Sequence, residues 1–105
     1  MQLLTKEVLA SLPKIYATEN EGMNALARVK FFMPDGNWTW YAAEFDGEDT
    51  FFGLVAGFAV EVGYFSLSEI KTVRGSLGLE VERDLYFKPV SLKQLEALHR
   101  RAMIA

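Results

Sequence analysis

Cysteine is absent from this 105-residue chain, so no disulfide, thiolate nucleophile or thiolate metal ligand can form. Histidine occurs once, as His99, and one imidazole without cysteine supplies too few ligands for a typical zinc site. An excess of positive charge is also missing, since the formal net charge is −3. That balance argues against a large phosphate-binding surface, because nucleic-acid modules usually have a basic face.

Long hydrophobic runs are missing as well. Gly53 and Gly57 interrupt the longest apolar region, which stays far below the roughly 20 residues that span a bilayer. The N-terminus has no basic stretch followed by an apolar core, so we expect no signal peptide. Together with the lack of cysteine, this predicts a cytoplasmic protein that does not associate with membranes. The length and a 50% hydrophobic composition predict one folded domain over residues 1–105.

Aromatic residues are plentiful, and both tryptophans lie between Asn37 and Ile70. Apolar alternation and turn residues predict antiparallel strands over 25–33, 37–45, 51–57 and 62–65, with a short last strand over 84–88. The chain must reverse between Gly57 and Val62, and the sequence does not say where.

Three hydroxyl residues stand where helix N-caps are expected: Thr5, Ser66 and Ser91. The first helix should end before Pro13, and the second should run to about Val73. The expected buried stripes are Val8, Leu9 and Leu12 in the first helix and Leu92, Leu95, Leu98 and Ala102 in the last. The fold class is therefore α+β, an antiparallel sheet of about four or five strands with N- and C-terminal helices and a short helix after the fourth strand.

The strand over 37–45 is apolar on both faces. One face should present Trp38, Trp40 and Ala42, and the other Thr39, Tyr41, Ala43 and Phe45. We expect the helices to cover one face and the other to be partly exposed toward a partner. An aromatic face rimmed by acidic residues would suit a basic protein, or could pair two copies of the chain as a homodimer. The candidate partner-binding residues are Trp38, Tyr41, Asp46, Glu48 and Asp49.

The only acidic cluster comprises Glu44, Asp46, Glu48 and Asp49. Its spacing does not fit a calcium-binding EF-hand loop, so we predict a solvated turn and no metal site. Substituting alanine for the last three should then leave stability nearly unchanged.

Residues for catalysis are not evident either. His99 has no recognisable orienting partner and is interpreted as a surface histidine. The glycines at 75 and 78 lack the lysine of a phosphate-binding loop. We therefore predict no catalytic residue and no cofactor. A basic strip of Lys93, Arg100 and Arg101 on the last helix is the candidate surface for nucleic acid, although Glu96 can neutralise part of it.

Four sequence blocks support a family resemblance: LLTKEVLASLPKIYATE, NWTWYAAEFDGEDTFFG, GYFSLSEI and GLEVERDLYFKP. Together they span nearly the whole chain, and they resemble a bacterial family of unknown function whose small members are carried on plasmids, integrated elements and phages. The resemblance implies no activity. It does imply mobile-element cargo, for which we expect a non-enzymatic protein-interaction module, with inhibition of a host defence system of the anti-restriction or anti-CRISPR type as one form. The alternative is a nucleic-acid-associated accessory protein of plasmid or phage replication or transfer.

Overall fold

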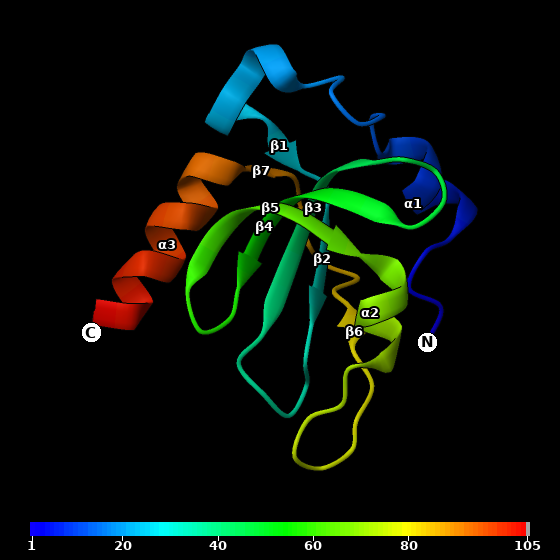
Figure 1. Cartoon of the computed structure of the whole chain (residues 1–105), viewed down its shortest axis with the longest axis vertical. Helices are drawn as coiled ribbons and strands as arrows, with labels where there is room; N and C mark the ends of the chain where they lie inside the picture. The colour runs from blue at the N-terminus through cyan, green and yellow to red at the C-terminus, as the bar shows by residue number, and fades with distance from the viewer. Residues whose placement is uncertain (105) are drawn as a thin grey trace.

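A five-stranded antiparallel sheet forms the centre of the computed structural model, which describes residues 1–104 (Figure 1). Its strands are β2 (Val29–Phe32), β3 (Thr39–Phe45), β4 (Thr50–Ala56), β5 (Val60–Ser66) and β6 (Glu82–Arg83). Their order is β5-β4-β3-β2-β6, and β1 (Leu26–Ala27) pairs separately with β7 (Val90–Ser91). Every pairing is antiparallel, which confirms the predicted α+β class.

The helices are α1 (Lys6–Ser11), the 3-10 helix η1 (Glu19–Asn24), α2 (Leu67–Thr72) and α3 (Leu92–Ile104). All three predicted caps are confirmed. The Thr5 hydroxyl accepts the Val8 amide at 3.3 Å, and the hydroxyls of Ser66 and Ser91 accept amides three residues on at 3.0 and 3.2 Å. No helix within residues 1–104 has the length and apolarity to cross a membrane.

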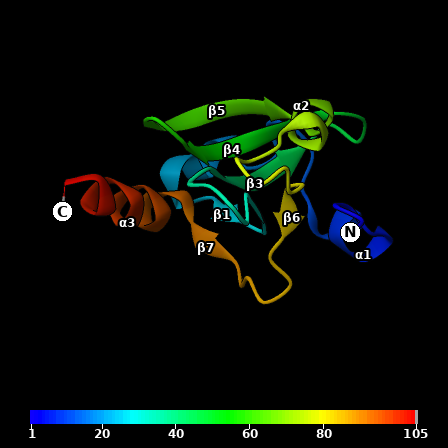
Figure 2. The same cartoon turned by 90° about the horizontal axis from the view of Figure 1, so that it is seen from below.

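Both faces of the sheet are covered, and each has its own core. One core holds Phe31, Trp40, Phe45, Phe51 and Phe65 beneath α2 and the N-terminal segment. The other holds Tyr41, Ala43, Leu54, Leu92 and Leu95 beneath α3 and residues next to η1. Both views show α3 on one side of the sheet and α1 and α2 on the other (Figures 1 and 2).

The double cover contradicts the expected exposed face of β3. Tyr41 is only 3% exposed, because its ring lies 5.7 Å from that of Phe87 and 5.4 Å from that of His99. The two-sided apolar pattern of this strand therefore reflects burial on both faces.

Other sequence expectations differ in detail. Leu9, Leu98 and Ala102 are exposed instead of buried. Figure 1 shows the C-terminal end of α3 at the margin of the molecule. The predicted strand over 84–88 is wrong, because the Asp84 carboxylate accepts the Tyr86 amide at 2.9 Å and turns the chain. The chain reversal that the sequence could not locate lies between the end of β4 and the start of β5, at residues 57–59.

Candidate functional site

A β-bulge interrupts the pairing of β3 with β4. Ala42 lies opposite Gly53, but the next pair joins Glu44 to Phe52, so one residue of β3 is passed over. Because side chains alternate along a strand, the shift moves everything beyond it to the opposite face. Phe45 consequently joins the core beside Trp40, which corrects its expected place beside Tyr41. The same shift directs Glu44 toward the face that η1 covers.

Glu44 is a buried carboxylate, with only 3% of its surface exposed. Its Oε1 accepts the Tyr16 amide at 2.9 Å, and its Oε2 accepts the Thr18 amide at 2.9 Å and the Thr18 hydroxyl. The ion pairs formed within residues 1–104 join other carboxylates to lysine and arginine, and Glu44 is in none of them. Two backbone amides and one hydroxyl, and not a basic side chain, thus hold this group.

Tyr16 has a φ of 71°, in the left-handed region that bulky residues rarely adopt. Such a conformation costs on the order of 1–3 kcal/mol and persists where the surrounding structure holds it. Here the hydrogen bond from its amide to Glu44 does so. The Tyr16 ring remains 67% exposed. Strain of this kind gathers at functional sites, so its occurrence beside a bulge and a buried charge marks this region.

These features meet at a cavity of about 280 Å³, which we call the Glu44 pocket. Its lining residues are Tyr16, Thr18, Glu19, Gly22, Met23, Glu44, Phe52, Tyr64 and Leu92. Phe52 and Tyr64 face each other across β4 and β5, with ring centroids 5.3 Å apart in an edge-to-face arrangement.

The Tyr64 ring is 56% exposed at the pocket rim. Its side-chain interaction with Tyr16 raises the pKa of Tyr64, with further contributions from burial and from the charges of Tyr16, Glu44 and Glu19. The phenol therefore stays neutral around physiological pH and can donate a hydrogen bond.

The pocket lining combines aromatic rings with one buried carboxylate. Its one buried acceptor group is Glu44, and neither histidine nor cysteine lines it. Within residues 1–104 no three residues of His, Cys, Asp or Glu gather in a way that could hold a metal ion. The aromatic walls and a single buried charge instead resemble a recognition pocket.

A second polar centre joins α3 to the sheet. The Tyr41 hydroxyl and His99 Nε2 share a hydrogen bond of 2.7 Å, so the expectation that His99 has no partner is wrong. Burial, and then the charge of Asp84, raises the pKa of Tyr41 to about 12. Burial, and then the charge of Lys30, lowers the pKa of His99. Both groups are therefore neutral at pH 7, and the pair holds α3 in place.

The five residues predicted to form a partner surface are not brought together. Trp38 lies on the face opposite Tyr41, with its ring 5.9 Å from that of Trp40 and 5.3 Å from that of Phe58. The acidic residues Asp46, Glu48 and Asp49 lie in the turn at the other end of β3. The proposed aromatic face with an acidic rim therefore does not exist as one surface.

The acidic turn has a structural role that its composition does not reveal. Asp46 Oδ1 accepts the amides of Glu48, Asp49 and Thr50 at 2.8–3.0 Å, and these bonds lower the pKa of Asp46. The Asp49 carboxylate accepts the amide and the hydroxyl of Ser68 at 2.8 and 2.9 Å, at the start of α2. Asp46 and Glu48 are exposed, as expected for a solvated turn, whereas Asp49 is half-buried.

The candidate basic strip is partly engaged in the fold. Arg100 Nη2 donates to the Val60 carbonyl at 3.3 Å and lies 3.4 Å from Glu96 Oε2. Lys93 and Arg101 are exposed on α3.

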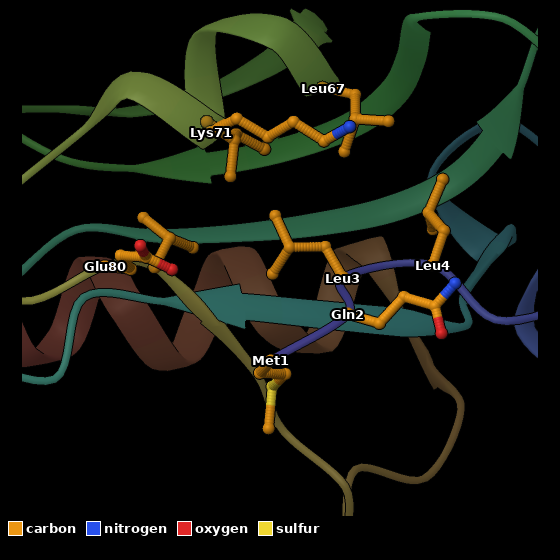
Figure 3. Close-up of a pocket in the computed structure, with 9 residues that line it drawn as sticks. Met1, Gln2, Leu3, Leu4, Leu67, Lys71 and Glu80 are labelled. Atoms are coloured by element: carbon orange, nitrogen blue, oxygen red, sulfur yellow. The ribbon is translucent and has the colours of Figure 1, made fainter.

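Another cavity, of about 380 Å³, lies between the N-terminal segment and α2. Figure 3 shows Leu3 and Leu4 facing Leu67, with Lys71 and Glu80 also on its walls. It has no aromatic wall, and its one cation and one anion offset each other, so it favours no particular ligand chemistry.

Comparison with known sequences gives a family but no activity. The chain matches, over residues 3–103, the family described as protein of unknown function (DUF2958). No curated protein and no solved structure shows a significant match. The match covers nearly the whole chain, as the resemblance of the four sequence blocks did, and the protein therefore belongs to the DUF2958 family of proteins of unknown function.

Proposed function

We propose that this protein is a non-enzymatic protein-interaction module and that the Glu44 pocket is its binding site. The observation that supports this is the exposure of Tyr16 and Tyr64 around a cavity that a bulge and a buried carboxylate build. Exposed tyrosines beside a small pocket are typical of interface hot spots, because a ring gives large contact area at low entropic cost.

The position of the pocket favours a protein partner. Tyr64 lies on β5, an outermost strand of the sheet, which within residues 1–104 pairs only with β4. An outer strand offers unpaired backbone groups to another chain, so a partner can bind the strand and the pocket together.

The cellular setting of the proposal follows the resemblance described above. A small binding module carried on a plasmid, integrated element or phage suits inhibition of a host defence protein in the cytoplasm, of the anti-restriction or anti-CRISPR type. Such an inhibitor needs only to occupy a surface of its target, which is what a domain without catalytic groups can do.

Affinity capture from a bacterial host with three forms of the tagged chain tests the proposal. We expect the wild type to retain a partner that the double variant Tyr16→Ala/Tyr64→Ala loses. Phe58→Ala is the matched control, because Phe58 is 94% exposed but lies at the other end of the β4–β5 hairpin. The proposal is wrong if the double variant retains the same proteins as the wild type.

Two competing outcomes have their own readouts. Concentration-dependent sedimentation that the double variant abolishes would show that the pocket pairs two copies of the chain. Salt-sensitive binding of single-stranded DNA that depends on Lys93 and Arg101 would favour the nucleic-acid accessory role.

A further inference from the structure

We propose that the Glu44 pocket receives a basic side chain, arginine or lysine, from the partner protein. This inference rests on the proposed function and specifies the chemistry that its site recognises. The charges, the free acceptor capacity, the aromatic walls and the size of the pocket each support it.

The pocket has an unbalanced negative charge. Two carboxylates line it, the buried Glu44 and the exposed Glu19, while no lysine, arginine or histidine does. A charge inside a protein is strongly favoured by an opposite charge nearby, because the interior screens less than water. A cationic group entering the pocket would supply the counter-charge that the fold leaves out.

Glu44 retains the capacity to accept one more hydrogen bond. An ionised carboxylate offers about four acceptor positions. Three are used here, one on Oε1 by the Tyr16 amide and two on Oε2 by Thr18. One position on Oε1 is unused, and Glu44 lines the pocket, so an entering N–H group could donate to it, with a charged donor giving the stronger bond.

Aromatic rings line the pocket that such a group would enter. Tyr16, Phe52 and Tyr64 line the pocket, with the last two edge to face. Ring faces attract ammonium and guanidinium groups electrostatically, and pockets that combine rings with a carboxylate favour organic cations over neutral groups.

The volume of the pocket and the oxygen groups that line it limit which ligands can bind there. A cavity of about 280 Å³ holds one long side chain. A hard metal ion wants six or more oxygen ligands, which two carboxylates of such different exposure do not provide. A phosphate group would face two negative charges without a basic residue.

A pair of model ligands isolates the role of charge. We would titrate ¹⁵N-labelled protein with N-acetyl-arginine amide and with its uncharged isostere N-acetyl-citrulline amide. We expect the arginine compound to shift the amides of Tyr16 and Thr18 with a Kd on the order of millimolar, as suits a single side chain. The citrulline compound should bind at least about tenfold more weakly. Equal binding of the two would overturn the inference.

Variants connect the binding to the pocket. Tyr64→Leu removes one ring and should weaken arginine-amide binding about fivefold. Tyr86→Leu is its control, because Tyr86 is an exposed tyrosine, at 90% against 56% for Tyr64, that lies outside the pocket. Glu44→Gln should abolish measurable binding, and if that variant does not fold, Tyr64→Leu remains decisive. Unchanged affinity in Tyr64→Leu would contradict the inference.

The source of the cation is tested by comparing agmatine with a glycine-flanked arginine pentapeptide. We expect the peptide to bind at least as tightly, because its backbone can also meet β5. Binding of agmatine alone would show a small-amine site and overturn the assignment to a protein side chain. Charge-selective binding without any pocket-dependent partner would refute the proposed function and leave the chemistry intact. If the pocket variants lose a partner protein but the arginine and citrulline compounds bind equally, the proposed function stands and the inference of a basic side chain is refuted.

Discussion

At the scale of single residues, the protein buries two polar groups whose hydrogen-bond partners lie far away in the sequence. Glu44 interrupts an apolar strand, and Tyr41 lies in the same strand two pairs away from the bulge. Each is satisfied by residues far along the chain, at separations of 26–28 positions for Glu44 and 58 for Tyr41. Burying a polar group without a partner is costly, so each of these bonds constrains the fold.

The Tyr41–His99 pair predicts a stability change in mild acid. The pKa of His99 in the folded protein lies below its ordinary value of 6.5, so the unfolded chain takes up the proton first. The contribution of neutral His99 is therefore complete above pH 6.5 and is lost as the pH falls through the folded-state pKa.

We expect urea unfolding to show a steeper loss of stability as the pH falls below 6.5 in the wild type than in His99→Gln, whose amide is neutral throughout. Tyr41→Phe should cost about 1 kcal/mol at pH 7, because it deletes a buried hydrogen bond. Identical pH slopes for the wild type and His99→Gln would show that His99 does not titrate in this way.

At the scale of secondary-structure elements, the bulge in β3 depends on a glycine in β4. Gly53 lies opposite Ala42, and a Cβ placed on it would stand 1.8 Å from the Tyr41 carbonyl oxygen. No side chain fits at this distance, so the two backbones can approach only because residue 53 is glycine. This close approach of the β3 and β4 backbones lies next to the register shift that turns Glu44 toward the pocket.

Gly63 provides a matched comparison for this claim, because it pairs with Gly53 across β4 and β5 and a Cβ there would meet nothing within 4 Å. We predict that Gly53→Ala lowers the free energy of unfolding by more than about 2 kcal/mol, since the clash is with backbone. Gly63→Ala should be neutral or stabilising by roughly 0.5 kcal/mol. Similar thermal unfolding of the two variants would show that β4 adjusts to a side chain at position 53.

Local chemistry made most elements predictable. The hydroxyls of Thr5, Ser66 and Ser91 form the caps that their spacing predicts, and alternation located β3 and β4 within one or two residues. The two-residue strands β6 and β7 were not predictable, because such short pairings depend on neighbours elsewhere in the chain. The strand predicted at 84–88 was wrong because the apolar alternation there lies in a turn that Asp84 closes.

The candidate site was not predictable in the same way. A bulge changes which face a residue occupies without changing the residue types, so the sequence placed Phe45 on the wrong face. One signal was present, namely a lone acidic residue between Ala43 and Phe45 in an otherwise apolar strand. Its partners at 16–18 could be found only from the folded chain.

At the scale of the whole molecule, the two faces of the sheet are closed in different ways. On one face, α2 and the N-terminal segment bury leucine and isoleucine against aromatic side chains. On the other face, the segment before η1 contributes no fully buried side chain and instead attaches through backbone bonds. The amides of Tyr16 and Thr18 donate to the Glu44 carboxylate, and the Phe45 amide donates to the Pro13 carbonyl at 2.9 Å.

Because the segment before η1 is attached mainly by hydrogen bonds, we predict that a substitution of Glu44 loosens that segment and leaves the sheet intact. Glu44→Gln keeps the size of the side chain but turns an N–H₂ group toward one of the amides that the carboxylate accepts. We expect it to lower the free energy of unfolding by roughly 1.5–3 kcal/mol, because hydrogen bonds to a charged group are lost. Glu48→Gln, on the exposed turn, is the control and should change stability by less than about 0.5 kcal/mol.

Hydrogen exchange locates the effect within the molecule. In Glu44→Gln, amides over 14–24 should exchange faster while those of β3, β4 and β5 remain protected, because the strand ladder does not use the Glu44 side chain. The walls that Tyr16 and Met23 give to the pocket would then loosen while Phe52 and Tyr64 stay in place. Uniformly faster exchange through the sheet would show instead that Glu44 supports the whole fold, and that the segment before η1 is not a separate unit.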